Sequence, residues 1–271
     1  MLFLRMLAMM MMILFGFHQE TRADAVILIH GYFSGEDAWN RSGVTSALEA
    51  AGWERGGTVV AGARGIDFKA ATPGVVKQGY YLADLPSEAP LVMQAQQLKE
   101  VVLAIRKHRG TDKIVLIGHS AGGVVARLTM VRNGGLDIHG LITIASPHLG
   151  TDKAEVAGLL ASTPMAMMAP MMGADTVNRS RQLYEDLVRE RPGSFLYWLN
   201  RQTHPKARYV SLVRKDSFAL FGDNMVPVWS QDMGKVAALK DAATSVSIGT
   251  NHGMERADGV ELVRILGEWL K

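Results

Sequence analysis

A serine in a glycine-bounded turn is the clearest reactive group in the sequence. Residues 118–122 read Gly-His-Ser-Ala-Gly, and they follow an apolar run over 114–117. Between a strand and a helix, this spacing is typical of a nucleophile elbow, in which a sharp turn exposes the hydroxyl. The glycines lack a Cβ and let neighbouring backbones approach closely. Ser120 is therefore a candidate nucleophile for acyl transfer. The alternative is a glycine-rich turn that only lets a helix pack on a sheet.

Such a serine needs a base, because a hydroxyl is a weak nucleophile at neutral pH, and the base needs an acid that orients it. In this arrangement the chain order is serine, acid, histidine. Only His204 and His252, of the eight histidines, come late enough to follow an acid. His252 follows the last predicted strand, whereas His204 stands beside Pro205 in a predicted loop. We therefore predict that His252 is the general base; the alternative is an exposed loop histidine.

Three aspartates after the predicted strand at 208–213 are candidates for the acid. Asp223 lies in a turn that reads Gly-Asp-Asn-Met-Val-Pro over 222–227. Asp216 stands beside Lys215 and fits a solvated surface charge, and Asp232 is further from the strand. We favour Asp223. Its alternative role is that of a turn aspartate that bonds its own backbone.

The tetrahedral intermediate of acyl transfer bears an oxyanion that needs preorganised N–H donors. One predicted donor is the backbone N–H of Ala121, directly after the nucleophile. The second is the N–H of Tyr32, in the His-Gly-Tyr turn that follows the first predicted strand. The alternative for this turn is an ordinary end of a strand.

Alternating strands and helices must position these groups. Apolar runs and helical periodicity predict strands over 26–29, 58–61, 113–117, 138–145, 208–213 and 245–248, and helices over 43–53, 91–108, 121–133 and 259–270. Residues 62–88 lack clear periodicity and contain several Gly and Pro residues, so we predict that they are mostly loop. Strands separated by helices indicate an α/β fold with a mostly parallel sheet flanked by helices, and the carboxyl ends of its strands meet at one edge.

The connection between Ser146 and Arg208 is far longer than an ordinary helix–strand connection. We predict a helical cap inserted after the strand that ends near Ser146, over about 151–206. Methionines are concentrated over 165–172, and their flexible thioethers suit contact with apolar ligands. Met165, Met168 and Met172 are therefore candidate substrate-binding residues for acyl chains or a lipid surface. The alternative is a core between cap helices.

The N-terminal residues 1–25 have the three parts of a secretory signal. Arg5 precedes an uncharged apolar run over 7–17, and Ala23-Asp24-Ala25 fits a small-x-small cleavage site. We expect a signal peptide, or otherwise an N-terminal anchor, followed by a catalytic domain over 26–271. This predicts a secreted or periplasmic protein.

Composition excludes several other classes of protein. The 271 residues are 48% hydrophobic, which excludes a disordered chain. With no cysteine, disulfides and cysteine-based metal sites are excluded. The net charge is +3 without a run of Lys or Arg, so no nucleic-acid partner is expected. We expect an ester or lipid substrate, transient contact with a lipid surface, and no cofactor or metal.

Together these motifs resemble the α/β-hydrolase superfamily, and more narrowly its secreted bacterial lipases and esterases. The matching segments are 29–32, 118–122, 144–151, 223–227 and 251–252. The resemblance implies a Ser120/Asp223/His252 triad, an oxyanion hole from Tyr32 and Ala121, and hydrolysis of carboxylic esters. The residues after His252 lack the aspartate with which some of these lipases bind calcium, so calcium is not expected. Alternatives are an acyltransferase on the same triad and a catalytically inactive binding module.

Overall fold

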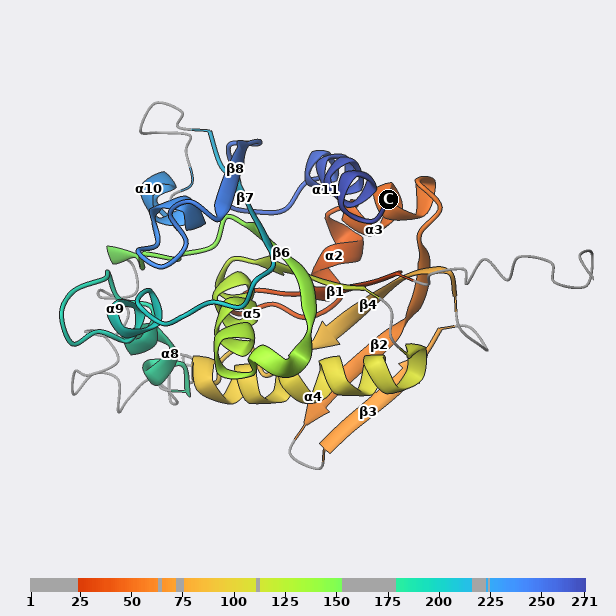
Figure 1. The fold of residues 1–271 in the computed structure, drawn as a ribbon, viewed down its shortest axis with the longest axis horizontal. Coiled ribbons are helices and arrows are strands. Elements are labelled where there is room, and N and C mark those ends of the chain that lie inside the picture. Colours follow the sequence, from red (N-terminus) through yellow and green to blue (C-terminus); the bar gives the residue numbers. More distant parts are fainter. Residues whose placement is uncertain are drawn as a thin grey trace, which may run out of the picture.

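The computed structural model describes residues 24–62, 65–71, 76–110, 113–152, 179–215, 223 and 225–271. Within these residues, strands form one sheet in the order β3-β2-β4-β1-β5-β6-β7-β8 (Figure 1). Every neighbouring pair is parallel except β2 and β3, which are antiparallel. The strands are β1 (Asp24–Ile29), β2 (Glu54–Gly62), β3 (Gly65–Ala70), β4 (Gln78–Asp84), β5 (Ile114–His119), β6 (Ile138–Ile144), β7 (Arg208–Val213) and β8 (Ala243–Ser247).

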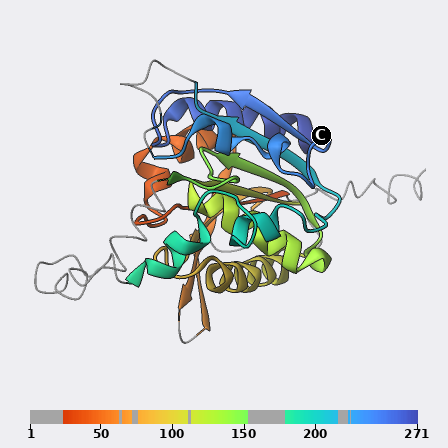
Figure 2. The same cartoon turned by 90° about the vertical axis from the view of Figure 1, so that its left-hand side faces the viewer.

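Helices cover both faces of the sheet, which explains why apolar residues of its central strands are buried on both sides. All six residues of β1 are buried. Ile27 and Ile29 belong to a core shared with α4 (Leu91–Arg109) and α5 (Ala121–Arg132). Val26 and Leu28 face the opposite way, into a core shared with α3 (Val44–Ala50) and α11 (Arg256–Trp269). Figure 2 shows these two helical layers on either side of the sheet.

Most predicted elements are confirmed, with ends shifted by a few residues. The six predicted strands are β1, β2, β5, β6, β7 and β8, and the four predicted helices are α3, α4, α5 and α11. The structure adds the short helices α2 (Ala38–Arg41) and α10 (Val228–Gln231), and it places α8 (Arg181–Asp186) and α9 (Phe195–Leu199) in the region of the predicted helical cap.

The prediction that residues 62–88 are mostly loop is wrong. They contain β3 and β4, and β4 lies between β1 and β2 near the centre of the sheet. Residues 80–83 of β4 are buried. Glycine disfavours strands, yet Gly79 pairs with both Ala25 of β1 and Glu54 of β2. Strand partners on both sides therefore override the local preference of the sequence.

The N-terminal strand bears on the predicted signal segment. Asp24 and Ala25 pair with Gln78 and Gly79, so β1 begins inside residues 1–25. A cleavage that leaves the sheet intact therefore falls before Asp24. Among the described residues, no helix has both the length and the apolar character needed to span a membrane.

The predicted cap corresponds to the connection between β6 and β7. Its described part contains α8 and α9, which lie together at one end of the sheet in Figure 1. Residues 153–178 are outside the described residues, and they include Met165, Met168 and Met172. The substrate-binding role of these methionines stays a prediction.

Candidate active site

Ser120 stands at the turn between β5 and α5, and its backbone is strained. Its φ is 52° and its ψ is −129°, a conformation that non-glycine residues rarely adopt. Ser120 is the N-cap residue of α5, so its hydroxyl lies at the positive end of the helix dipole. The turn predicted from the Gly-His-Ser-Ala-Gly spacing is confirmed.

Two glycines make this sharp turn possible. A Cβ on Gly118 would lie 2.4 Å from the Cα of Gly123, and a Cβ on Gly122 would lie 2.3 Å from the carbonyl oxygen of His30. Both contacts are with backbone atoms, which cannot move aside as a flexible side chain can. Strand β5, helix α5 and the end of β1 therefore touch at this point only because glycine occupies these positions.

Backbone strain is concentrated at the same edge of the sheet. Among the described residues, the non-glycine residues with positive φ are Phe33, Ser120, Asp137 and Ala145. Three of them, Phe33, Ser120 and Ala145, follow the carboxyl ends of β1, β5 and β6. Such strain is typical of functional sites, where the surrounding structure holds residues in costly conformations.

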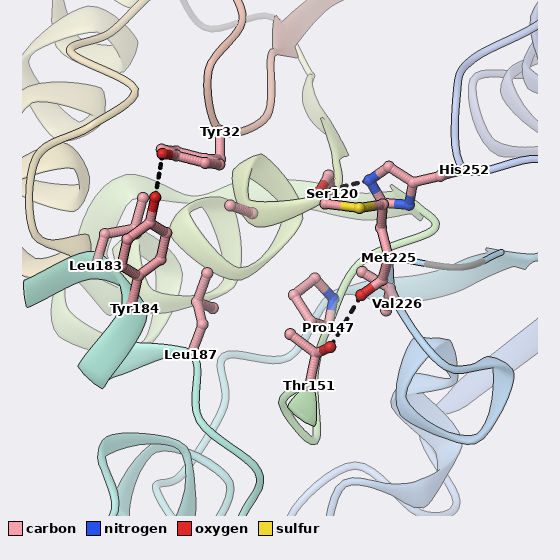
Figure 3. A pocket seen from close by; sticks show the side chains of 11 residues that line it. Tyr32, Ser120, Pro147, Thr151, Leu183, Tyr184, Leu187, Met225, Val226 and His252 are labelled. Carbon is pink, nitrogen blue, oxygen red and sulfur yellow. Dashed lines mark hydrogen bonds between the residues drawn. The ribbon is translucent and has the colours of Figure 1, made fainter. Parts of the chain in front are cut away.

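His252 reaches the nucleophile from the loop between β8 and α11. Its Nε2 atom is 3.0 Å from Ser120 Oγ, although 132 residues separate the two in the chain (Figure 3). Its Nδ1 atom is 2.8 Å from Asp223 Oδ2. If Nδ1 bears the proton and donates it to the carboxylate, Nε2 is free to accept the serine proton. The histidine is therefore set up as a base.

Asp223 is held by four hydrogen bonds. Oδ1 accepts the N–H groups of Met225 and Val226 at 2.8 and 2.9 Å, and Oδ2 accepts Gln231 Nε2 at 3.0 Å as well as His252 Nδ1. Burial raises the pKa of Asp223, but the hydrogen bonds and the charge of His252 outweigh it, so the net pKa is lowered. The carboxylate stays ionised and can stabilise a charged imidazole.

The other candidates for the acid and the base are placed differently. Asp232 caps a short 3-10 helix by accepting the N–H of Gly234 at 2.8 Å. His204 Nδ1 is 2.9 Å from the Gln202 carbonyl oxygen, and its ring meets Tyr209 edge-on. Asp216 is outside the described residues. The structure thus brings together Ser120, His252 and Asp223, the three residues favoured from the sequence.

The two predicted oxyanion donors lie beside the nucleophile. Ala121 is the first residue of α5, where helix N–H groups have no partner within the helix. None of the hydrogen bonds formed among the described residues uses the Tyr32 N–H. Between Tyr32 and the sheet, Gly31 passes so close to the nucleophile that its Cβ would lie 2.9 Å from Ser120 Cβ. Tyr32, Ser120 and Ala121 all line the same cavity.

His119 supports the loop of the candidate base. Its Nε2 atom is 2.9 Å from the carbonyl oxygen of His252, and the two rings are 5.2 Å apart. Burial, and after it the neighbouring His252, lowers the pKa of His119 to about 3. The neutral ring therefore donates an N–H to the His252 carbonyl. The sequence shows His119 only as the variable residue of the serine motif, and no signal there predicts this contact.

A mostly apolar cavity of about 220 Å³ opens at Ser120. Its walls include Leu183 and Leu187 from the α8 region, Pro147 after β6, and Met225 and Val226 after Asp223. Sequence analysis missed these residues. The four-residue spacing of Leu183 and Leu187 is the one signal that indicates an apolar helix face there.

Two tyrosines add a polar contact to the cavity wall. The hydroxyls of Tyr32 and Tyr184 are hydrogen-bonded to each other, and Figure 3 shows them on the side of the cavity away from His252. Burial, followed by the hydrogen bond with Tyr32, raises the pKa of Tyr184. Its hydroxyl thus stays protonated. The contact joins the predicted oxyanion loop to helix α8.

Among the residues that the structure describes, no group of three or more His, Asp or Glu side chains is arranged to hold a metal ion.

Comparisons with known proteins identify the fold. A family model described as a PGAP1-like alpha/beta domain matches residues 62–156. No curated protein sequence matches the chain. Among solved structures, the product of the Listeria innocua gene lin2722 is 15% identical, with a TM-score of 0.63; the match covers 92% of this chain and 94% of that one.

Two further structures show that this fold serves more than one reaction. Mature lipase BlEst2 from Bacillus licheniformis is 16% identical, with a TM-score of 0.58, and 92% and 93% of the two chains are covered. Bottromycin epimerase BotH, in complex with bottromycin A2, is 13% identical, with a TM-score of 0.51 and 91% of each chain covered. At these identities the likeness concerns the fold, so the reaction has to be argued from the site.

Proposed function

We propose that this chain, which has the α/β-hydrolase fold, is a serine hydrolase that cleaves carboxylic esters through an acyl-enzyme. The observation that supports this most directly is the continuous relay from Ser120 Oγ through the His252 ring to Asp223, with contacts of 3.0 and 2.8 Å. Such a relay turns a weakly nucleophilic hydroxyl into an effective one.

In the acylation step, Ser120 Oγ attacks the ester carbonyl carbon while His252 Nε2 takes the hydroxyl proton. The carbonyl oxygen becomes an oxyanion that accepts the N–H groups of Tyr32 and Ala121. When the tetrahedral intermediate collapses, the C–O bond to the alcohol breaks and His252 returns the proton to the leaving oxygen. Asp223 keeps the imidazole in the required tautomer and stabilises its charged form.

In the deacylation step, water takes the place of the alcohol. His252 removes a proton from the water as its oxygen attacks the acyl carbon, and the same two N–H groups stabilise the second oxyanion. Collapse of this intermediate returns the proton to Ser120 Oγ and releases the carboxylic acid. The enzyme is regenerated without a cofactor.

The cavity favours an ester with an apolar acyl group as substrate. Leu183, Leu187, Pro147 and Val226 offer alkyl surface beside Ser120, and burial of a hydrocarbon against such surface is favourable. The methionines over 165–172 stay candidate binding residues for such a substrate, because their flexible thioethers suit contact with apolar ligands. Likeness in fold to a lipase is consistent with this choice. We therefore include lipid esters, and transient contact with a lipid surface, in the proposal.

Export is the second part of the proposal. The basic start, apolar run and small residues over 1–25 support a signal peptide and a secreted or periplasmic location. Mass spectrometry of the protein recovered from the culture medium or the periplasm tests this. We expect a mass lower than that of the full chain, because cleavage before Asp24 removes most of residues 1–25.

A fluorophosphonate probe tests the reaction. We expect covalent labelling of Ser120, identified by peptide mass, and hydrolysis of p-nitrophenyl esters at a rate that falls by several orders of magnitude in S120A. Absence of labelling in folded protein would contradict the proposal and favour a binding module. Product analysis with an added alcohol separates hydrolysis from acyl transfer to that alcohol.

A further inference from the structure

A fully buried ion pair lies beneath the loop that holds His252. Arg214, directly after β7, and Asp258, in the first turn of α11, have side chains that are 0% and 1% exposed. Arg214 Nη1 donates to Asp258 Oδ1 at 2.6 Å, and Nη2 donates to Oδ2 at 3.1 Å. The two groups thus form a two-point contact, which fixes the plane and the direction of the guanidinium.

The same guanidinium donates hydrogen bonds to the loop on both sides of His252. Nη1 also donates to the carbonyl oxygen of Ile248 at 3.2 Å, and Nη2 donates to that of Gly253 at 2.8 Å. Ile248 precedes His252 by four residues, and Gly253 follows it directly. A planar group with several N–H donors in a rigid fork can make all these contacts at once, which a lysine ammonium cannot.

The backbone of the loop closes directly over Arg214. A Cβ on Gly249 would lie 2.9 Å from Arg214 Nη1, and Gly249 has a φ of 65°. The Gly249 carbonyl oxygen also accepts the Lys215 N–H at 2.8 Å. Glycine at this position lets the loop turn tightly against the charged group.

The backbone of Arg214 is connected to the acid. Its N–H donates to Gln231 Oε1 at 2.8 Å, and Gln231 Nε2 donates to Asp223 Oδ2 at 3.0 Å. Arg214 therefore contacts the loop of the candidate base through its side chain, and the partner of the candidate acid through its backbone.

Stability alone is a poor explanation for this ion pair. Taking two charges out of water is costly, and apolar residues of similar volume in such places often leave a protein equally stable or more so. What apolar residues would not supply is the set of fixed donors to the Ile248 and Gly253 carbonyls.

We propose that Arg214 and Asp258 are positioning residues that hold His252 in line with Ser120 and Asp223. This inference rests on the proposed function for its kinetic consequence. Small displacements of a reacting group can cost about a hundredfold in rate, so the ion pair would act on the chemical step rather than on substrate binding.

The variant R214K tests this, because it keeps the charge and removes the fork. We expect kcat on a short soluble p-nitrophenyl ester to fall about tenfold to a hundredfold, with KM unchanged, when rates are divided by the active sites counted with a fluorophosphonate.

The matched control is R109K. Arg109 is also buried, and it donates to the carbonyl oxygens of Val76 and Asp24, at the opposite end of β1. We expect the R109K variant to be less stable than the wild type and to keep the wild-type kcat.

A second measurement does not depend on catalysis. The Nδ1 proton of His252, hydrogen-bonded to Asp223, should give a low-field NMR signal in the wild type and in R109K, and should shift or broaden in R214K. Should R214K fail to fold, D258N takes its place, because it keeps the side-chain shape and removes the charge. Wild-type protein that neither labels nor hydrolyses esters overturns the proposed function, while the NMR signal still tests the positioning. Wild-type kcat and an unchanged signal in the folded variant would overturn the positioning role.

Discussion

A methyl group on Gly122 would meet the carbonyl oxygen of His30 at 2.3 Å. His30 is the first residue of the His-Gly-Tyr turn that holds the predicted oxyanion donor Tyr32, and Gly122 directly follows the first residue of α5. The nucleophile turn and the oxyanion turn thus pack backbone against backbone, with no room for a side chain between them.

Gly122→Ala should therefore destabilise the protein, even though alanine is the better helix former. We expect a loss of about 1–3 kcal/mol in the free energy of unfolding, as for other overpacked sites. Gly267→Ala is the matched control, because Gly267 lies in α11 and has nothing within 4 Å of an added Cβ. It should gain roughly 0.5–1 kcal/mol. Urea unfolding measures both, and equal stability of the two variants would contradict the close contact.

Replacing Ser120 should separate its chemical role from its strain. Ser120→Ala and Ser120→Gly both remove the hydroxyl, so both should lower kcat by up to about 10⁶-fold. Only glycine relieves the φ of 52°, so S120G should be more stable than S120A by about 1 kcal/mol. Ester hydrolysis and thermal unfolding measure the two effects. A lower melting temperature for S120G than for S120A would contradict the strain, because glycine at an unstrained position destabilises a protein through the entropy of its unfolded chain.

Acid should destabilise the protein in part through His119. Because burial lowers its folded pKa to about 3, while an unfolded histidine titrates near about 6.5, only the unfolded chain binds this proton between those values. Stability should therefore fall as the pH decreases through this window. In His119→Gln, whose amide can still donate to the His252 carbonyl, the fall between pH 7 and 5 should be smaller. Urea unfolding at several pH values measures this; an identical slope in both proteins would refute it.

Leu187→Phe should narrow the cavity beside Ser120. We expect kcat/KM for long p-nitrophenyl esters to fall more than that for the acetate, because the larger ring occupies space that the acyl chain needs. Leu103→Phe, on the exposed side of α4, is the control and should leave the preference unchanged. An equal loss on all esters in L187F would indicate that the acyl chain lies elsewhere.

The site was more predictable than the sheet. Ser120 is predictable because the flanking glycines are needed for the close backbone contacts of a nucleophile turn. His252 is predictable because the chain order of the triad leaves few other histidines. Asp223 has a local signal in its Gly-Asp-Asn turn, whereas no local pattern separates it fully from Asp216 and Asp232. In the chain, His252 is 29 residues from Asp223 and 132 residues from Ser120. The three residues can still meet because each follows a strand of the same parallel sheet, and the sequence indicates the order of those strands well.

Other features depend on contacts that no local pattern reveals. Strand β4 contains Gly79 and follows a Pro- and Gly-containing stretch, so its own sequence resembles a loop. Only pairing with β1 and β2 makes it a strand. Arg214 reads as a surface charge next to Lys215, and its burial depends on Asp258, 44 residues later. Pairings of this kind arise when the chain is folded, and they are invisible to periodicity.

The central position of β1 sets an order for folding during synthesis. β1 leaves the ribosome before the other strands that the structure describes, yet its partners are β4 and β5. Ala25 meets its β4 partner, Gly79, only 54 residues later, and its β5 partner, Ile114, 89 residues later. Contacts so distant in sequence form slowly, and an exposed apolar strand is prone to aggregate in the meantime. The nascent chain should accordingly depend on chaperones more than a protein whose first strand pairs with its second.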